Sequence, residues 1–299
     1  PTHSIRPQDR RIAQVREARM QYFGIERSGG VAVCTMTNPP MNYLTGPMAQ
    51  ELGQVTEALA DDRDVRAVIL TGGVRGKFVT HYNVDELVQL AADAERYREF
   101  GARGTAAFHA LLARVQQLPK PVIAALNGDC MGGGFELALA CDFRLAALGP
   151  YQIGLPESRL GILPGGGGTQ RLTRLIGAAK ALEVMLFGNV YPPEDAVRLG
   201  LVHRAIPEHD LMGIALDWAR QLALQPPKAL AMIKRAVYEG GDTTFERGLA
   251  IERECFTEVM CSRDARVGMA AYVEAVRRDP MAARTRFLNG EGVPAYTGE

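Results

Sequence analysis

Hydrophobic residues in the first half of the chain form short continuous runs separated by stretches with helical spacing. The short runs are rich in β-branched residues and end in turn residues, which is typical of buried strands; they cover residues 31–36, 67–71 and 121–126. Apolar residues at helical spacing predict helices over residues 48–60 and 108–115. Strands that alternate with helices predict a parallel sheet flanked by helices, which is a fold of the α/β class.

Beyond Gly165 the pattern becomes almost purely helical. It predicts seven helices, over residues 169–176, 178–186, 193–199, 210–224, 228–237, 245–260 and 264–276. Helical faces this apolar pack on the main domain or on a neighbouring subunit. Residues 277–299 combine proline, glycine and charge without a sustained period, so we expect an extended or irregular tail. At the other end, we expect a surface helix within residues 5–20.

Composition excludes several classes of function. The 34 basic residues equal the 34 acidic ones, so no net charge attracts the molecule to nucleic acid or to an anionic membrane. No apolar run approaches the ~20 residues of a membrane span, and the first residues lack the compact apolar stretch of a secretory signal. We therefore expect a globular, cytoplasmic protein with no nucleic-acid partner and no membrane partner.

The cysteines indicate free thiols rather than a metal site or disulfides. They form no Cys-x-x-Cys pair and no spacing with histidine that a zinc site needs. We expect them to be reduced, and we expect no metal site. The five are Cys34, Cys130, Cys141, Cys255 and Cys261.

Two segments each bring a carboxylate next to a turn of special backbone. Residues 131–137 read Met-Gly-Gly-Gly-Phe-Glu-Leu, and residues 155–157 read Leu-Pro-Glu. Glycine lets the main chain approach a reacting atom closely, so its N–H groups can stabilise a developing oxyanion. A carboxylate beside such backbone can move the proton that forms or removes an enolate. This combination predicts an enzyme that acts on a thioester.

The glycine runs 132–134 and 165–168 do not match nucleotide-binding motifs. Neither fits the dinucleotide fingerprint, and the second is followed by Thr-Gln-Arg rather than by Gly-Lys-Ser/Thr. NAD and ATP sites are therefore not expected.

The two segments and their surroundings resemble the crotonase family, also called the enoyl-CoA hydratase/isomerase family. The resemblance is carried by 121-PVIAALNGDCMGGGFELALACDFRLA-146 and 152-QIGLPESRLGILPGGGGTQRLTRLIG-177. These stretches place a buried strand, a triple-glycine turn, a glutamate on the next helix and a second glutamate after proline in the family's order. The resemblance extends from about residue 22 to residue 278.

The resemblance implies an architecture as well as a reaction. The family fold is a ββα spiral core followed by a C-terminal helical trimerisation region, so a homotrimer or a homohexamer built as a dimer of trimers is expected. On this basis residues 1–20 are an N-terminal extension, 21–205 the spiral core with the active site, 206–278 the helical region, and 279–299 a tail.

Two glutamates are the candidate catalytic residues. Glu136 lies just inside a predicted helix, and the positive end of that helix favours the ionised form of its carboxyl group. Glu157 follows a proline among apolar residues, which would raise the pKa of its carboxyl group. Either residue could instead be an ordinary glutamate, one placed for the helix dipole and the other exposed in a turn. The family's hydratases use both glutamates to add water to a trans-2-enoyl-CoA, with Glu157 protonating the α-carbon and Glu136 activating the water.

Two backbone N–H groups complete the predicted oxyanion hole. By resemblance they belong to Gly133 and Tyr82. The loop before Tyr82 departs from the family pattern, since His81 stands where a glycine is usual and Asn83 where an aspartate is usual. Both replacements tolerate left-handed backbone better than most residues. His81 could also act as an additional acid or base, or serve only loop geometry.

The resemblance also suggests where coenzyme A lies. We expect the pantetheine arm against Met41 and Asn42, and the adenine against Tyr82 and Val84. The glycine backbone at residues 132 and 133 would also contact the substrate. A plain strand-to-helix turn also explains the Asn-Pro-Pro sequence that precedes Met41. Coenzyme A enters as part of the acyl-CoA thioester substrate, and no separate cofactor is implied.

Two alternatives to an enoyl-CoA hydratase follow from the same sequence. Another reaction of the same superfamily on an acyl-CoA, such as isomerisation, decarboxylation or a specialised dehydration, is kept open by the departures at His81 and Asn83. The family's isomerases, however, typically keep only the second glutamate. A non-catalytic or RNA-binding protein with the same fold would be favoured by a basic surface and by missing glutamates. Neither the charge balance nor the two glutamates support that alternative.

Overall fold

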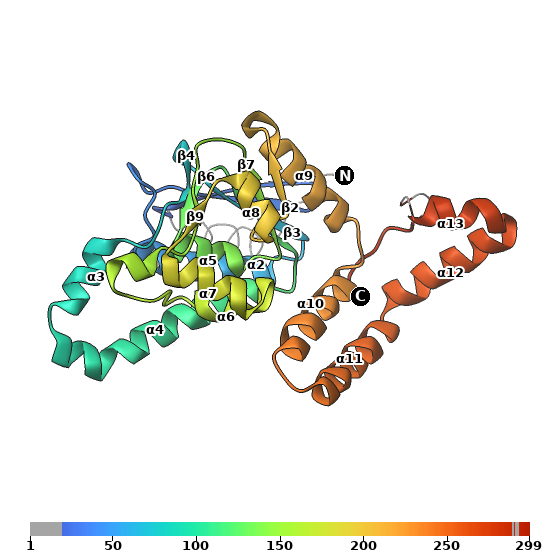
Figure 1. Ribbon diagram of the computed structural model, residues 1–299. Coiled ribbons are helices and arrows are strands. Elements are labelled where there is room, and N and C mark those ends of the chain that lie inside the picture. Colours follow the sequence, from blue (N-terminus) through green and yellow to red (C-terminus); the bar gives the residue numbers. More distant parts are fainter. Residues whose placement is uncertain (1–19, 289, 291–292) are drawn as a thin grey trace, which may run out of the picture.

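Two β-sheets form the centre of the structure, a computed structural model that describes residues 20–288, 290 and 293–299 (Figure 1). The helix expected within residues 5–20 lies outside the described residues, apart from Met20 at its end. In the larger sheet, the first two strands pair antiparallel and all later neighbours pair parallel. Its order is β1 (Phe23–Ser28), β2 (Val31–Met36), β3 (Ala67–Gly72), β5 (Val122–Leu126), β7 (Phe143–Ala147) and β10 (Arg204–Ile206). The three strands predicted from the sequence are β2, β3 and β5, so the prediction of a parallel sheet is confirmed.

A smaller sheet of four short strands lies beside the larger one. Its order is β4 (Gly76–Val79), β6 (Gly128–Met131), β8 (Ile153–Gly154) and β9 (Val190–Tyr191). The first three strands are parallel, and the last is antiparallel to its neighbour. The chain adds a strand to the larger sheet and then one to the smaller sheet, as β3–β4, β5–β6 and β7–β8. After each of these strand pairs, the chain continues from the carboxyl end of a short strand of the smaller sheet.

Helices cover both sheets and continue beyond them. In the first half of the chain they are α2 (Gly46–Asp61), α3 (Val84–Ala91), α4 (Ala94–Gln116) and α5 (Gly133–Leu139). The second half contains the 3₁₀ helix η1 (Glu157–Leu160), α6 (Gly168–Ile176), α7 (Ala178–Phe187), α8 (Pro193–Leu199), the 3₁₀ helix η2 (Glu208–Asp210), α9 (Leu211–Ala223), α10 (Pro227–Gly241), α11 (Phe245–Met260), α12 (Arg263–Arg278) and α13 (Pro280–Leu288). All seven helices predicted beyond Gly165 are present. Within the described ranges, no helix combines the length and the apolar character needed to cross a bilayer.

The larger sheet is buried on both faces, which explains its continuous apolar strands. Successive side chains of a strand point to opposite faces. In β3, Val68 and Leu70 therefore pack into the core on the side of α2, whereas Ala67 and Ile69 pack against α9. Alternate residues of β5 divide in the same way. Although α9 falls within the predicted C-terminal helical region 206–278, it lies on the sheet.

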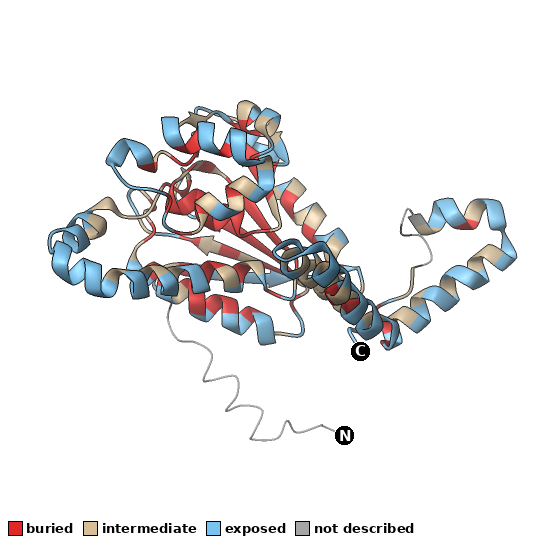
Figure 2. Ribbon diagram, turned by 60° about the horizontal axis from the view of Figure 1, so that its bottom comes forward, coloured by how far each residue is buried: buried red, intermediate tan, exposed pale blue. Residues whose placement is uncertain are grey.

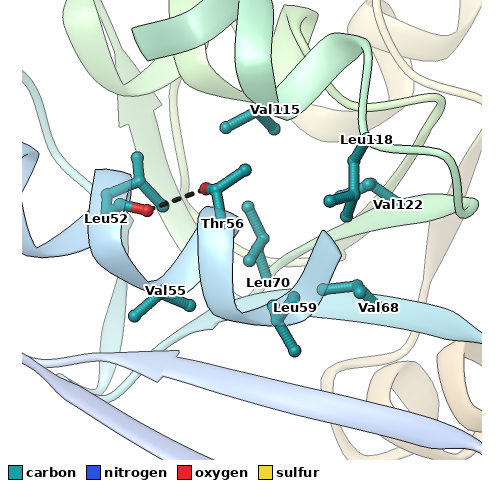
Figure 3. A pocket seen from close by; sticks show the side chains of 9 residues that line it. All are labelled: Leu52, Val55, Thr56, Leu59, Val68, Leu70, Val115, Leu118 and Val122. Carbon is teal, nitrogen blue, oxygen red and sulfur yellow. Dashed lines mark hydrogen bonds between the residues drawn. The ribbon is translucent and has the colours of Figure 1, made fainter. Parts of the chain in front are cut away.

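A small cavity remains between α2, the end of α4 and the strands β3 and β5 (Figure 3). Its volume is about 10 Å³, which is room for about one water molecule. The one polar side chain among the residues that line it is that of Thr56, whose hydroxyl donates a hydrogen bond to the Leu52 carbonyl at 2.7 Å. No ionisable side chain reaches the cavity, so it is a packing gap rather than a reaction site. It is lined by Leu52, Val55, Thr56, Leu59, Val68, Leu70, Val115, Leu118 and Val122.

Helices α10 to α13 extend away from the sheets as an arm (Figures 1 and 2). The arm is attached through Asp142, whose carboxylate accepts hydrogen bonds from Lys234 Nζ at 2.7 Å and from the Tyr238 hydroxyl at 2.8 Å. Beyond this attachment, many large apolar side chains of the arm are exposed within the single chain. They include Val237, Phe245, Phe256, Met260, Met269 and Met281. The arm thus presents apolar surface that the main body of the described chain does not cover.

The expectation of an irregular tail over residues 277–299 is wrong for its first part, because residues 280–288 form α13. Asp279 accepts hydrogen bonds from the backbone N–H groups of Met281 and Ala282, at 3.1 and 2.9 Å. Pro280 occupies the first helical position, where proline is well tolerated because that N–H has no helical partner. The Asp279-Pro280 pair therefore starts a helix, even though apolar residues do not recur at helical spacing in this segment.

The last described residues, 293–299, are extended and bind to both the arm and the main body. Asp264 is buried, and its two carboxylate oxygens accept hydrogen bonds from Thr297 N at 2.9 Å and from Gly298 N at 2.7 Å. Arg66, at the start of β3, donates to the Tyr296 carbonyl at 2.7 Å. The tail therefore joins α12 to the residue that precedes β3, a central strand of the larger sheet.

Replacing Asp264 with asparagine is expected to release the tail. The substitution removes the negative charge and places an amide donor opposite a backbone N–H. Hydrogen bonds to a charged group contribute about 1.5–3 kcal/mol, so the amides of Thr297 and Gly298 should exchange their hydrogens much faster. Hydrogen exchange of the two variants Asp264→Asn and Asp217→Asn provides the comparison, since Asp217 is exposed on α9. Unchanged protection of the tail in Asp264→Asn would contradict this account.

Candidate active site

The candidate site lies where three parallel strands of the smaller sheet end. Strand β4 leads into Thr80-His81-Tyr82, β6 into the triple glycine, and β8 into Leu155-Pro156-Glu157. Backbone hydrogen bonds continue beyond the strands, from Met131 N to the Thr80 carbonyl at 2.9 Å and from Gly132 N to the Gly154 carbonyl at 3.0 Å. The carboxyl ends of parallel strands are a common location for ligand sites in α/β proteins. The structure thus brings the predicted site segments together.

Each residue of the triple glycine packs against a different part of the site. A Cβ atom on Gly132 would lie 3.2 Å from Glu157 Oε1, and one on Gly133 would lie 3.3 Å from Tyr82 N. A Cβ on Gly134 would lie 2.0 Å from the Val79 carbonyl oxygen, a distance that no side chain tolerates. Gly132 also has a φ of +49°, a conformation that favours glycine. The glycines therefore allow the second carboxylate, the loop after β4 and β4 itself to approach the start of α5.

Glu136 lies on α5 with its carboxylate in a backbone cradle. The side chain is 3% exposed, and Oε1 accepts hydrogen bonds from Gly166 N and Gly168 N, each at 2.7 Å. Burial raises the pKa of Glu136, and the two N–H groups oppose that shift. The sequence argument from the helix terminus predicted the opposite direction, because it could not account for the depth of burial.

The second glycine run, residues 165–168, has a function that sequence reasoning missed. A Cβ on Gly166 would lie 2.5 Å from Glu136 Oε2, and one on Gly168 would lie 2.9 Å from Glu136 Oε1. These glycines therefore let the backbone come close enough to bind the carboxylate. The sequence contains the run, but nothing in it indicates that the partner is a glutamate about 30 residues earlier.

Glu157 begins η1 and has a buried oxygen without a partner. The residue is 8% exposed, and Oε2 makes no hydrogen bond within the described structure. Burial, together with the nearby Glu136 carboxylate, raises the pKa of Glu157 to about 7. The predicted rise is confirmed. Of the four apolar residues expected around it, Ile153 and Leu155 are buried, whereas Leu160 and Ile162 are exposed. Buried polar atoms are rarely left without a partner, so Glu157 Oε2 is a candidate for a functional atom.

The N–H groups of Tyr82 and Gly133 are the two donors of the predicted oxyanion hole. Within the described residues, neither donates a backbone or side-chain hydrogen bond, although their backbones lie side by side. The peptides on either side of Tyr82 are fixed, since Leu44 N donates to the His81 carbonyl at 2.9 Å and Asn83 N donates to the Leu44 carbonyl at 2.8 Å. Two adjacent free donors on fixed backbone are the arrangement that can receive an oxyanion.

The two departures from the family pattern have local structural roles. The His81 ring stacks on Tyr43, with centroids 4.4 Å apart, and its Nδ1 donates a hydrogen bond to the Tyr82 carbonyl at 2.7 Å. Asn83 caps α3, because its side-chain oxygen accepts a hydrogen bond from Asp85 N at 2.9 Å. Both side chains thus stabilise the loop that presents the Tyr82 N–H. These contacts favour the geometric role for His81 over a role as acid or base.

The residues predicted to contact coenzyme A surround the site but differ in accessibility. Asn42 is fully buried, and its amide group donates to the Met36 and Phe78 carbonyls and accepts from Asn38 N. Its side chain therefore binds the loop itself. Met41 and Val84 are partly exposed. Substrate contact by these residues stays a prediction.

The side chain of Tyr82 is fixed on α3. Its hydroxyl donates a hydrogen bond to Glu86 Oε2 at 2.8 Å, and its ring packs edge-on against Phe108. Burial, with Glu86 adding to the effect, raises the pKa of the Tyr82 hydroxyl above its ordinary value. The tyrosine therefore remains neutral and stabilises the loop through its side chain as well as its backbone.

Comparison with known proteins agrees with this arrangement. The family described as enoyl-CoA hydratase/isomerase matches residues 26–281. A short-chain-enoyl-CoA hydratase of Clostridium acetobutylicum and a crotonyl-CoA hydratase of Syntrophomonas wolfei are each 35% identical over 251 residues, which are 84% of this chain and 94% of each relative. A solved enoyl-CoA hydratase from Bacillus anthracis has a TM-score of 0.79 and 30% identity, covering 93% of this chain and 100% of that one.

The chain therefore belongs to the enoyl-CoA hydratase/isomerase family. Its fold is the crotonase fold, as the sequence resemblance implied.

The raised pKa of Glu157 makes stability depend on pH with a defined sign. Its pKa is about 7 in the folded state and 4.5 ordinarily, so the folded state holds the proton more tightly. The contribution to stability is fully present below about pH 4.5 and is lost as pH rises through about 7. The free energy of unfolding of the wild type should therefore fall from pH 5 to pH 8 relative to Glu157→Gln. Urea unfolding at the two pH values measures this difference, with Glu183→Gln on the exposed side of α7 as control. A pH-independent difference between wild type and Glu157→Gln would contradict the assignment.

Proposed function

We propose that this protein is an enoyl-CoA hydratase, a hydro-lyase that adds water syn to the double bond of a trans-2-enoyl-CoA and catalyses the reverse dehydration of a 3-hydroxyacyl-CoA. The observation that carries the proposal is the buried carboxyl group of Glu157 near Glu136, whose Oε2 has no partner within the described residues and whose Oε1 lies next to Gly132. A carboxyl group with a pKa of about 7 is suited to exchange a proton at neutral pH. The names of the relatives support the same reaction.

The N–H groups of Tyr82 and Gly133 are proposed to bind the thioester oxygen. As water adds to the β-carbon, negative charge develops on that oxygen, and donors already in place stabilise it without rearrangement. Removing one donor of such a pair lowers the rate by on the order of 10²–10³-fold in enzymes that depend on it. The contacts of His81 and Asn83 keep the first donor in position.

The two glutamates divide the proton transfers. Glu136, ionised in its cradle, accepts a proton from water as the water oxygen bonds to the β-carbon. Glu157, protonated, donates its proton to the α-carbon, and the electron pair of the double bond forms the new C–H bond by way of the enolate. The cycle closes when Glu136 loses a proton and Glu157 regains one. The dedicated cradle of Glu136 favours this reaction over an isomerisation that needs only the second glutamate.

Coenzyme A is proposed to enter along the loop that precedes α2. Met41 would contact the pantetheine arm, and the exposed parts of Tyr82 and Val84 would contact the adenine. Asn42 would act indirectly, by holding the loop through its buried amide group. The carboxyl groups and the backbone donors supply the chemistry of hydration, so coenzyme A is needed only as part of the substrate.

The arm is proposed to form contacts between subunits in a homotrimer or a homohexamer. Exposed apolar side chains such as Phe245 and Phe256 support this, since surfaces of this kind mark interaction sites. A cytoplasmic location is part of the proposal and is supported by five free cysteines, four of them buried.

Substitution of either glutamate by glutamine tests the reaction. Glu136→Gln and Glu157→Gln are each expected to lower hydration of crotonyl-CoA by about 10²–10⁴-fold, because each removes a positioned acid or base. The loss of conjugated thioester absorbance follows the reaction, and Glu183→Gln should behave as wild type. Full activity in either site variant would sink the assignment of that residue. A wild-type protein that binds the thioester without turnover would refute the hydratase itself.

Substitution within the second glycine run tests the cradle. Gly166→Ala places a Cβ 2.5 Å from Glu136 Oε2 and should displace the carboxylate, lowering turnover by on the order of 10²-fold for a shift of about 1 Å. The matched variant is Gly165→Ala, whose Cβ meets nothing closer than 3.9 Å and which should have a far smaller effect. Steady-state kinetics, with thermal unfolding to verify the fold, compares the two. Equal losses would indicate that loop flexibility matters rather than close approach.

A further inference from the structure

The loop that binds Glu136 has no side chains of its own to fix it. Residues 165–168 are four consecutive glycines, and two of them supply the N–H groups that hold the carboxylate. Glycine loses more conformational freedom on folding than any other residue, so an unsupported glycine loop would sample many conformations. Gly168 is the first residue of α6, so that helix directs its N–H group, whereas the Gly166 N–H must be directed by groups outside the loop.

Side chains from two helices bind the carbonyl groups of this loop. His109, on α4, donates through Nε2 to the Gly165 carbonyl at 2.8 Å. Arg171, on α6, donates through Nη1 to the Gly166 carbonyl at 3.0 Å. The next carbonyl, that of Gly167, accepts the backbone N–H of Arg171 at 2.9 Å. Three consecutive peptide groups are thus held. The first and the third carry the N–H groups that donate to Glu136, and the Arg171 guanidinium binds the peptide between them.

Arg171 is itself fixed in orientation. Its Nε donates to Gln116 Oε1, at the end of α4, at 2.8 Å. A planar guanidinium that binds at two of its nitrogen atoms leaves little freedom for the side chain. A Cβ on Gly167 would lie 2.5 Å from Arg171 Nη1, so only glycine lets the guanidinium pack so closely over the loop. The arginine therefore links α4, the loop and α6 in one rigid contact.

The charge of Arg171 also acts on the carboxylate. Its hydrogen-bond partners, Gln116 and the Gly166 carbonyl, are neutral, and none of the ion pairs between described residues includes it. Burial dominates the pKa of Glu136 and raises it. The backbone donors of Gly168 and Gly166 lower it, and so do the positive charges of Arg171 and His109. Arg171 thus favours the ionised form that the proposed reaction needs.

We propose that Arg171, oriented by Gln116 and assisted by His109, is a positioning residue for the reaction, because it holds the glycine loop so that its two N–H groups point at Glu136. Its effect on turnover rests on the proposed function. Its effect on the loop does not, so the two claims are measured separately.

Hydrogen exchange tests the effect on the loop. In Arg171→Met the amides of Gly166 and Gly168 should exchange roughly tenfold faster, because the carbonyl of Gly166 loses its side-chain donor. Arg174→Met is the matched control: Arg174 lies on the same helix, is about half exposed and pairs with Asp242 at 2.5 Å. Wild-type exchange at both glycines in Arg171→Met overturns the proposal, whatever the protein catalyses. An equal acceleration in Arg174→Met overturns it too.

Kinetics with crotonyl-CoA tests the effect on turnover. Arg171→Met should lower kcat by on the order of 10²-fold with little change in KM, as expected for a catalytic group displaced by about 1 Å. The acidic limb of its kcat–pH profile should move to higher pH, because the charge that favours ionised Glu136 is gone. Arg171→Lys keeps the positive charge but loses the planar set of guanidinium donors. The acidic limb of its kcat–pH profile should therefore return towards the wild-type position, while kcat recovers only in part.

A purely structural role gives a different result. It would reduce the folded fraction and the unfolding temperature while leaving the pH limb of the remaining activity in place, and that outcome overturns the positioning role. Faster loop exchange with a wild-type kcat overturns it as well. Absence of hydratase activity in the wild type would refute the proposed function alone, and the exchange comparison would still decide the claim about the loop.

Discussion

The parallel pairing of β4, β6 and β8 is the constraint on which the site depends. These strands are only four, four and two residues long, so they contribute little surface to the core. Their pairing nevertheless brings three distant loops to one edge of a sheet. Every group with a proposed chemical role lies within five residues of the end of one of these strands. A register shift at this sheet would separate the carboxyl groups from the backbone donors.

Close approach of the backbone is the second condition, and it explains why the glycines fall in two runs. The first run lets β4, the loop after it and Glu157 meet at the start of α5, and the second surrounds the carboxylate of Glu136. A Cβ atom at Gly132, Gly166 or Gly168 would come within 3.2 Å of a carboxylate oxygen of the site. The result is a buried pair of acidic groups, of which Glu136 is held by main-chain N–H groups. Burying two carboxyl groups costs free energy, and the rest of the fold must offset that cost.

The sequence was sufficient for the large elements and for the identities of the two glutamates. Helices α8 and α11 match their predicted bounds, because capping residues such as Thr244 and Gly200 mark where they begin or end. The smaller sheet was not predicted. Its segments, such as Gly-Lys-Phe-Val, are too short for any period, and each strand pairs with a partner far along the chain. The cradle was missed for the same reason: its glycines are visible, but the carboxylate they bind becomes their neighbour only in the folded protein.

The contact between Arg66 and Tyr296 has a consequence for the order in which the chain folds. It joins residues 230 positions apart and therefore closes a loop that contains nearly every other element. The entropy lost in closing a loop grows with its length, and contacts of such long range form slowly. The larger sheet and the arm must both be in place before the tail can bridge them. Attachment of residues 293–299 would therefore occur late in folding, after the larger sheet and the arm have reached their relative orientation.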